Sequence, residues 1–215
     1  MDPADTARQI ADDFRALPKE STAPMRQVRR RWSTTLCKEP AERIVELALD
    51  LLERQGYRWI AYELILFHPT ALHLIDEAEL ERFAGRMSSW SDVDQFAVLL
   101  AGPAWRTGQI ADSTIYAWAG RPDRWWRRAA LVATVPLNAR SQGGKGNVQR
   151  TLAVCERLLE DRDDMVVKAM SWALRELIVH DRYAVEAFLI EHDHLLAARV
   201  KRDVRNKLTT GLKNP

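Results

Sequence analysis

Apolar and polar residues alternate along most of the chain with the period of an α-helix. Apolar side chains recur three or four residues apart, as in Ala7, Ile10 and Phe14, which is the spacing of one helix face. No segment shows the every-second-residue alternation of a half-buried strand. The pattern therefore predicts an all-α protein. The predicted helices span residues 3–17, 25–38, 40–55, 57–68, 71–87 (one or two short helices), 88 or 89 to 102, 108–119, 122–135, 147–161, 163–179, 181–192 and 194–210.

Proline and glycine mark several predicted helix boundaries. Pro40 suits a first helical turn, whereas Gly56 and Pro69 are typical of helix ends. A turn is predicted at residues 21–24, and the Gly102-Pro103 pair is predicted to end the helix that begins at Ser88 or Ser89. Helices separated by such short turns are typical of helical bundles and repeats.

Residues 138–147 form the longest flexible-looking loop, with the sequence Asn-Ala-Arg-Ser-Gln-Gly-Gly-Lys-Gly-Asn. Its glycines and Lys145 resemble a phosphate loop only loosely. The spacing G-x-x-x-x-G-K-[ST] is absent and no strand precedes the loop. A mobile connection is the favoured interpretation, with a phosphate contact from Lys145 left open.

A short pattern recurs along the chain: an apolar residue, then a base, then two residues, then a small or apolar one. Successive occurrences lie 29 to 41 residues apart, which is the period of a two-helix unit. We therefore expect a HEAT-like solenoid of about six helix pairs, with residues 1–215 as one domain and a basic concave face. The second residue of the pattern is Arg29, Arg58, Asp94, Arg127, Lys168 and Arg205 in turn.

The composition is that of a soluble globular protein, with 47% hydrophobic and 29% charged residues. No run approaches the eighteen apolar residues of a membrane span, and the first residues lack the features of a signal peptide. Cys37 and Cys155 are interpreted as reduced core thiols of a cytoplasmic protein. Histidine and cysteine never cluster at ligand spacing, so no metal site is expected.

Basic residues are concentrated in three blocks, at 26–38, 121–150 and 199–213, on an otherwise acidic chain. Such blocks can converge into a surface that binds a polyanion, or they can be ordinary solvated helix faces. The residues predicted to contact the phosphates of such a polyanion are Arg26, Arg30, Arg31, Lys145, Lys201, Arg202 and Arg205.

Asp94 is the one acid among the six repeat positions. It lies four residues after Trp90, so the two side chains share a helix face. Cations nearby, Arg58 and Arg127 and also Arg128, are expected to depress its pKa and keep it ionised. A capped helix with a core tryptophan and a solvated or salt-bridged aspartate is the alternative interpretation.

Three ordered segments resemble signatures of the AlkD-type DNA glycosylases. They are Trp90-x-x-x-Asp94, Trp125-Trp126-Arg127-Arg128-Ala129-Ala130, and Val167-Lys168-Ala169-x-x-Trp172-Ala173-Leu174-Arg175-Glu176. Tyr57-x-x-x-Ala61-x-x-Leu64 fits the preceding repeat. Together the segments cover most of the chain, and the combination is more specific than any one of them.

The resemblance implies a solenoid of HEAT-like repeats that holds duplex DNA and removes N3- and N7-alkylated purines without flipping the base into a pocket. It implies Asp94 as the catalytic residue, Trp90 and Trp172 beside the deoxyribose, and Arg128 as the partner of the aspartate. It implies a monomer that needs no metal or cofactor.

Two alternatives stay open. The family usually has Trp-Trp-Asp around the first tryptophan, whereas this chain has Ser89 and Ser91, so Asp92 competes with Asp94 for the catalytic role. A catalytically silent helical-repeat protein that binds DNA or another protein is the second functional hypothesis. Retention of Trp90, Asp94, Arg128 and Trp172 together favours the enzyme.

Overall fold

The computed structural model describes residues 2–19 and 21–214, and in these residues it contains helices and no strand. The chain has two compact units, Met1–Gly85 and Arg86–Pro215. The prediction of an all-α protein is confirmed, and the helix pairs described below are compatible with a helical-repeat solenoid. The single domain and the basic concave face stay predictions.

The first unit contains five α-helices and a short 3₁₀ turn in its described residues: α1 (Pro3–Arg15), α2 (Thr22–Leu36), α3 (Ala41–Glu53), α4 (Arg58–Phe67), the turn Ala71–Leu74 and α5 (Glu77–Ala84). Helix α3 packs against α1 and α4, and α2 packs against α4. The turn predicted at residues 21–24 is wrong, because α2 already begins at Thr22 with Ser21 as its N-cap.

A buried ion pair joins α2 and α4 in this unit. Arg29 Nε donates to Glu63 Oε2 at 3.0 Å, and the guanidinium of Arg29 also stacks on the Phe67 ring. Burial raises the pKa of Glu63, and the neighbouring Arg29 opposes that rise. Arg29, one of the recurring bases, is therefore used to connect two helices.

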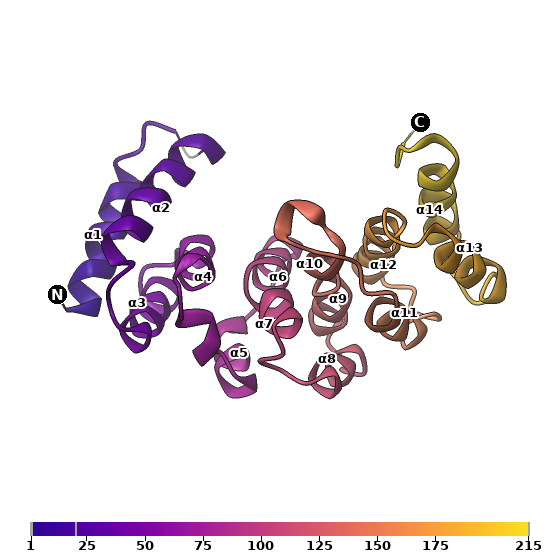
Figure 1. The fold of residues 1–215 in the computed structure, drawn as a ribbon, viewed down its shortest axis with the longest axis horizontal. Helices are drawn as coiled ribbons and strands as arrows, with labels where there is room; N and C mark the ends of the chain where they lie inside the picture. Colours follow the sequence, from indigo (N-terminus) through magenta and orange to yellow (C-terminus); the bar gives the residue numbers. More distant parts are fainter. Residues whose placement is uncertain (1, 20, 215) are drawn as a thin grey trace. The chain divides into compact units, whose positions relative to one another are not determined.

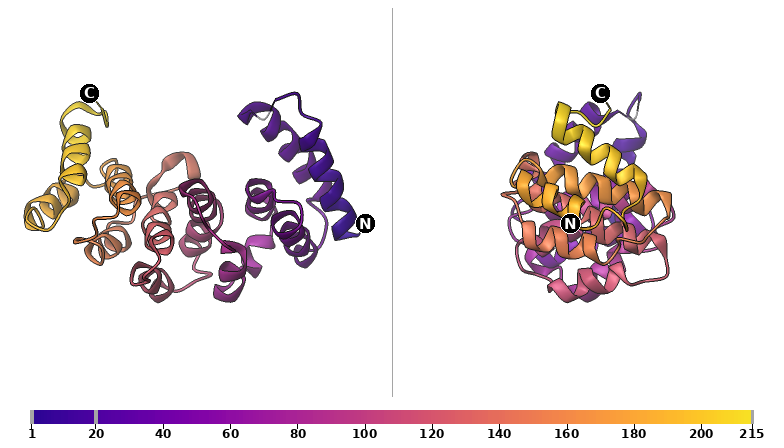
Figure 2. Two further views of the ribbon diagram at one scale, coloured as in Figure 1. Left: turned by 180° about the vertical axis from the view of Figure 1, so that it is seen from behind. Right: turned by 90° about the vertical axis from the view of Figure 1, so that its right-hand side faces the viewer.

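The second unit contains the helices α6 (Trp90–Phe96), α7 (Gly102–Arg106), α8 (Asp112–Ala119), α9 (Arg124–Val132), α10 (Val135–Asn138), α11 (Val148–Glu156), α12 (Asp164–Leu177), α13 (Arg182–Glu191) and α14 (Ala198–Thr210), with a 3₁₀ turn at Arg140–Gln142. Helices α6, α9 and α12 lie side by side, and α8 and α11 pack beneath them (Figures 1 and 2). Helix α14 packs on the far side of α12.

The core of the second unit includes aromatic residues that the repeats bring together. Trp105 and Trp118 are fully buried in the packing between helices. Trp118 contacts Phe96 and Trp126, with ring centroids 5.7 and 5.0 Å away. Because Phe96 lies on α6, this cluster fixes the helix that carries Trp90 and Asp94.

The predicted helix end at Gly102-Pro103 is wrong. A π-helical turn at Ala97–Ala101 joins α6 to α7, and the helix continues to Arg106. The π-turn shifts the hydrogen-bonding pattern, so Pro103 falls at the start of α7, where its missing N–H is tolerated.

The two cysteines differ in environment. Cys155 is buried, as predicted, and burial raises the pKa of its thiol. Cys37 is exposed at the C-terminal end of α2, so its interpretation as a core thiol is wrong. No helix in the described part of the chain is long and apolar enough to cross a membrane.

Gly102 is required by the close approach of α7 to α10. A Cβ atom there would lie 2.7 Å from both the Ala133 carbonyl oxygen and Pro136 Cγ. We expect Gly102→Ala to lower the free energy of unfolding by about 1–3 kcal/mol, the usual cost of overpacking. Urea unfolding followed by far-UV circular dichroism measures this.

Gly120→Ala is the matched control, because its Cβ would meet only the Ala117 oxygen at an ordinary 3.6 Å and its φ of −87° suits alanine. We expect a change within about 0.5 kcal/mol. Equal stability of the two variants would contradict the steric argument.

Candidate active site

The second unit has a cavity of about 540 Å³ between α6, α9, α12 and the C-terminal part of the chain. Trp90, Asp94, Arg128 and Trp172 all line it. The structure therefore brings together the four residues that the sequence predicted for one site, although they come from three helices.

Asp94 and Arg128 form a two-point ion pair across α6 and α9. Arg128 Nε donates to Asp94 Oδ1 at 2.9 Å, and Arg128 Nη2 donates to Oδ2 at 2.8 Å. The third guanidinium nitrogen donates to the Met165 carbonyl oxygen at 2.6 Å. The Arg128 side chain is 7% exposed and that of Asp94 is 19% exposed, so the carboxylate retains access to the cavity while the guanidinium is held behind it.

The expected downward shift of the Asp94 pKa is wrong. Burial raises the pKa of Asp94 above its usual range, and the hydrogen bonds and charge of Arg128 oppose this rise without cancelling it. The prediction assumed several surrounding cations, and two of the named ones are engaged elsewhere. Arg127 Nε donates to Asp161 at 2.7 Å, and Arg58, in the first unit, donates to the Tyr62 hydroxyl and the Ala84 carbonyl.

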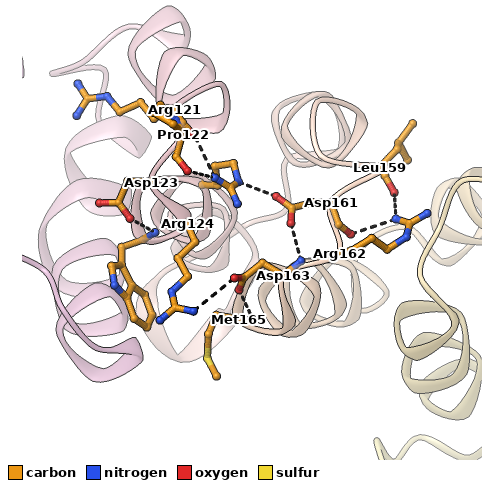
Figure 3. Close-up of polar contacts among 11 residues, drawn as sticks. Arg121, Pro122, Asp123, Arg124, Leu159, Asp161, Arg162, Asp163 and Met165 are labelled. Atoms are coloured by element: carbon orange, nitrogen blue, oxygen red, sulfur yellow. Dashed lines mark hydrogen bonds and ion pairs between the residues drawn. The ribbon is translucent and has the colours of Figure 1, made fainter.

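Polar contacts between two turns set the spacing of α9 and α12. Asp163 caps α12 by accepting from the Met165 amide at 2.8 Å, and it also pairs with Arg124 at 3.5 Å. Asp161 accepts from the Asp163 amide at 2.9 Å (Figure 3). These contacts hold the first turn of α12, whose Met165 carbonyl receives Arg128.

Asp92 has a different role in the structure from Asp94. The Ser89 hydroxyl accepts from the Asp92 amide at 3.2 Å, and Asp92 Oδ2 accepts from the Ser88 and Ser89 amides, both at 3.1 Å. This capping box turns the Asp92 carboxylate toward the N-terminus of α6. Asp94, two residues later, lines the cavity instead.

The two tryptophans of the cavity are held differently. Trp90 is the first residue of α6 and is 57% exposed. Trp172 lies in the middle of α12, and its indole Nε1 donates to Glu176 Oε1 at 3.0 Å. Both tryptophans line the same cavity as Asp94.

Four further cations line the cavity, and none of them was among the predicted site residues. They are Lys168, Arg175, Lys207 and Lys213. Lys168 occupies a repeat position, and Lys207 lies one turn after Asp203 on the side of α14 that packs against α12. The helical positions of Lys168, Arg175 and Lys207 were therefore available signals, although the sequence alone does not reveal which side of α14 faces the site. Lys213 lies beyond the end of α14 at Thr210.

The predicted phosphate contacts lie outside this cavity. Arg26, Arg30 and Arg31 are exposed on α2 in the first unit, and Arg31 pairs with Asp13. Lys145 lines a second cavity of about 340 Å³ together with Arg106 and Arg150.

The three predicted contacts on α14 have acidic neighbours. Lys201 and Arg205 both pair with Asp193, and Arg202 pairs with the buried Asp203. Their charge is thus partly neutralised within the chain, and their contact with DNA stays a prediction.

The chain matches a family model over most of its length. The model described as "DNA alkylation repair enzyme" matches residues 12–208. Searches among curated proteins and among solved structures give no match. The matched range contains Asp94 and Arg128 of the ion pair, both cavity tryptophans and Lys207.

Replacing Arg128 tests the electrostatic account of the site. The hydrogen bonding and the positive charge of Arg128 both lower the pKa of Asp94, so we expect Arg128→Met to raise that pKa further. Carbon-13 NMR titration of the Asp94 carboxyl carbon, assigned with Asp94→Asn, measures the shift.

Arg157→Met is the control, because Arg157 lies in the same unit but stacks on Tyr116 and donates to the Ala153 carbonyl, away from the Asp94 cavity. We expect it to leave the Asp94 pKa unchanged. An Asp94 pKa that does not rise in Arg128→Met would contradict the assigned role of Arg128.

Proposed function

We propose that the chain, which belongs to the family of DNA alkylation repair enzymes, is a DNA glycosylase for cationic alkylpurines. It would hydrolyse the N-glycosidic bond of N3- and N7-alkylated purines in duplex DNA. The observation that carries the proposal is the cavity in which a carboxylate, held at two points by an arginine, lies with two tryptophans.

The chemistry of the lesion matches this arrangement. Alkylation at N3 or N7 makes the purine cationic, so the base leaves as a neutral molecule and needs no general acid. Breaking the bond develops positive charge on the deoxyribose. A carboxylate directed at that charge stabilises the transition state more than the substrate, which is the requirement for rate enhancement.

The neighbours of Asp94 have defined parts in this mechanism. Arg128 fixes the orientation of the carboxylate and favours its ionised form, and each carboxylate oxygen has a lone pair left to orient the attacking water. The indole faces of Trp90 and Trp172 add cation–π attraction for the same sugar. Lys168, Lys207 and Lys213 at the cavity are suited to flanking phosphates.

The partner in this proposal is double-stranded DNA that contains alkylated purines. We expect a cytoplasmic protein that acts as a monomer. Arg26, Arg30 and Arg31, together with Lys145, would add phosphate contacts, so duplex binding should weaken with rising salt concentration.

Asp94→Asn is the first test. Removing one charge that acts on the transition state costs about a hundredfold or more in rate, so we expect at least that loss in single-turnover release of 7-methylguanine from duplex DNA. Chromatography of the released base, with the abasic strand detected after alkaline cleavage, measures it.

Asp92→Asn makes the same chemical change two residues away, at the helix cap. We expect its rate to stay within about twofold of the native rate, because its carboxylate faces the helix terminus. Equal losses in both variants would remove Asp94 from the catalytic role. Duplex binding without release by the native protein, over several alkylated lesions, would favour the silent binding protein.

The rate should depend on pH through Asp94. Only the ionised carboxylate stabilises the sugar cation, so the rate falls as pH drops through the pKa of Asp94. Burial raises that pKa above 3.8. We therefore expect the rate to fall at a higher pH than it would if the catalytic group were an exposed carboxyl. Single-turnover rates, corrected for spontaneous depurination of the same duplex, check this. An acid limb at the ordinary aspartate value would contradict it.

A further inference from the structure

Glu176 is a second carboxylate in the Asp94 cavity. It lies on α12 one helical turn after Trp172, and both side chains line the cavity. Glu176 Oε1 accepts a hydrogen bond from the Trp172 indole Nε1 at 3.0 Å. The proposed chemistry leaves this residue without a part, because a cationic base departs without a proton donor.

The backbone beneath Trp172 is anchored independently of Glu176. The neighbouring residues Ser171 and Ala173 are fully buried, and the Ser171 hydroxyl contacts the buried Asp203 of α14 at 3.4 Å. Core packing therefore fixes α12, whereas Trp172 is only partly buried and the polar edge of its indole is held by Glu176.

The charge of Glu176 has an electronic consequence for the ring. An indole N–H that donates to an anionic acceptor is polarised, because electron density moves from the N–H bond toward the ring. A ring richer in electron density attracts a cation over its face more strongly. The carboxylate lies at the ring edge, so the face stays available to the sugar.

We propose that Glu176 is a positioning residue that orients the Trp172 indole through its N–H and strengthens the attraction of that ring for the cationic sugar. The inference rests on the proposed glycosylase function and adds to it a residue that acts on the transition state through another side chain.

Two substitutions separate the hydrogen bond from the charge. Glu176→Gln keeps an oxygen that can accept from the indole but removes the charge, and Glu176→Ala removes both. We expect single-turnover release of 7-methylguanine to fall about threefold in the Gln variant and about tenfold in the Ala variant, the range of a partly desolvated cation–π contact. The dissociation constant for undamaged duplex should not change.

Glu186→Gln is the matched control. Glu186 carries the same charge in the same unit but pairs with the exposed Arg182 of α13. Its rate should equal that of the native protein. A loss equal to that of Glu176→Gln would mean that net charge alone is measured, and would overturn the proposal.

A double-mutant cycle with Trp172→Phe tests the route of the effect. Phenylalanine has no N–H, so Glu176→Gln should add no further loss of rate in that background. The same threefold loss in both backgrounds would show that Glu176 acts without Trp172, and would overturn the proposal.

An equilibrium measurement separates failure of this inference from failure of the proposed function. The probe is a duplex in which the lesion sugar is a pyrrolidine, cationic at neutral pH, compared with one carrying a neutral tetrahydrofuran. We expect the native protein to prefer the cationic duplex, and Glu176→Gln to reduce that preference about threefold.

If Glu176→Gln releases 7-methylguanine at the native rate and keeps the native preference for the cationic duplex, the role of Glu176 is rejected and the glycosylase function stands. A native protein that neither releases an alkylpurine nor prefers the cationic duplex would reject both.

Discussion

The ion pair between Asp94 and Arg128 is the interaction on which the candidate site depends. It joins α6 to α9 through two hydrogen bonds, and the same guanidinium reaches α12 through the Met165 carbonyl. A buried pair of this kind is costly to break, because either partner alone would be an uncompensated charge. It therefore locks three helices into the arrangement that places Trp90 and Trp172 at one cavity, and it leaves the carboxylate oriented before any substrate binds.

The same kind of contact recurs along the chain with the period of the repeat. Arg29 and Glu63, Asp94 and Arg128, and Arg127 and Asp161 are each separated by 34 residues. Positions 34 residues apart lie close together on neighbouring repeats, either on the helices or in the turns that precede them, so opposite charges placed there pair. Arg29 and Arg127 are thus structural connections, and only the Asp94 pair has its acid at the cavity. The recurring bases predicted from the sequence do not form a row of uncompensated cations.

Burial has opposing effects on the Asp94 cavity. It raises the pKa of Asp94, which works against the ionised form, and it also excludes water that would weaken the attraction between a carboxylate and a developing cation. Arg128 makes these effects compatible. Its charge favours the ionised form of Asp94, and its two hydrogen bonds use one lone pair of each carboxylate oxygen and leave the other lone pair for a substrate or water. The pKa of Asp94 is thus set by two opposing effects, desolvation of the carboxylate and the charge of Arg128.

The sequence by itself determined the helices and the local relation of Trp90 to Asp94, because a helix hydrogen-bonds within itself and its apolar period shows which positions share a face. The family resemblance named Arg128 as the partner of Asp94, but the helical pattern alone did not, since Arg127 and Arg128 point about 100° apart around α9. Packing against α6 and α12 decided that choice. Tertiary structure also decided the direction of the Asp94 pKa, the capping role of Asp92, the continuation of the helix through Pro103 and the presence of Lys207 and Lys213 at the cavity. Each of these depends on burial or on distances between helices, which a local pattern does not specify.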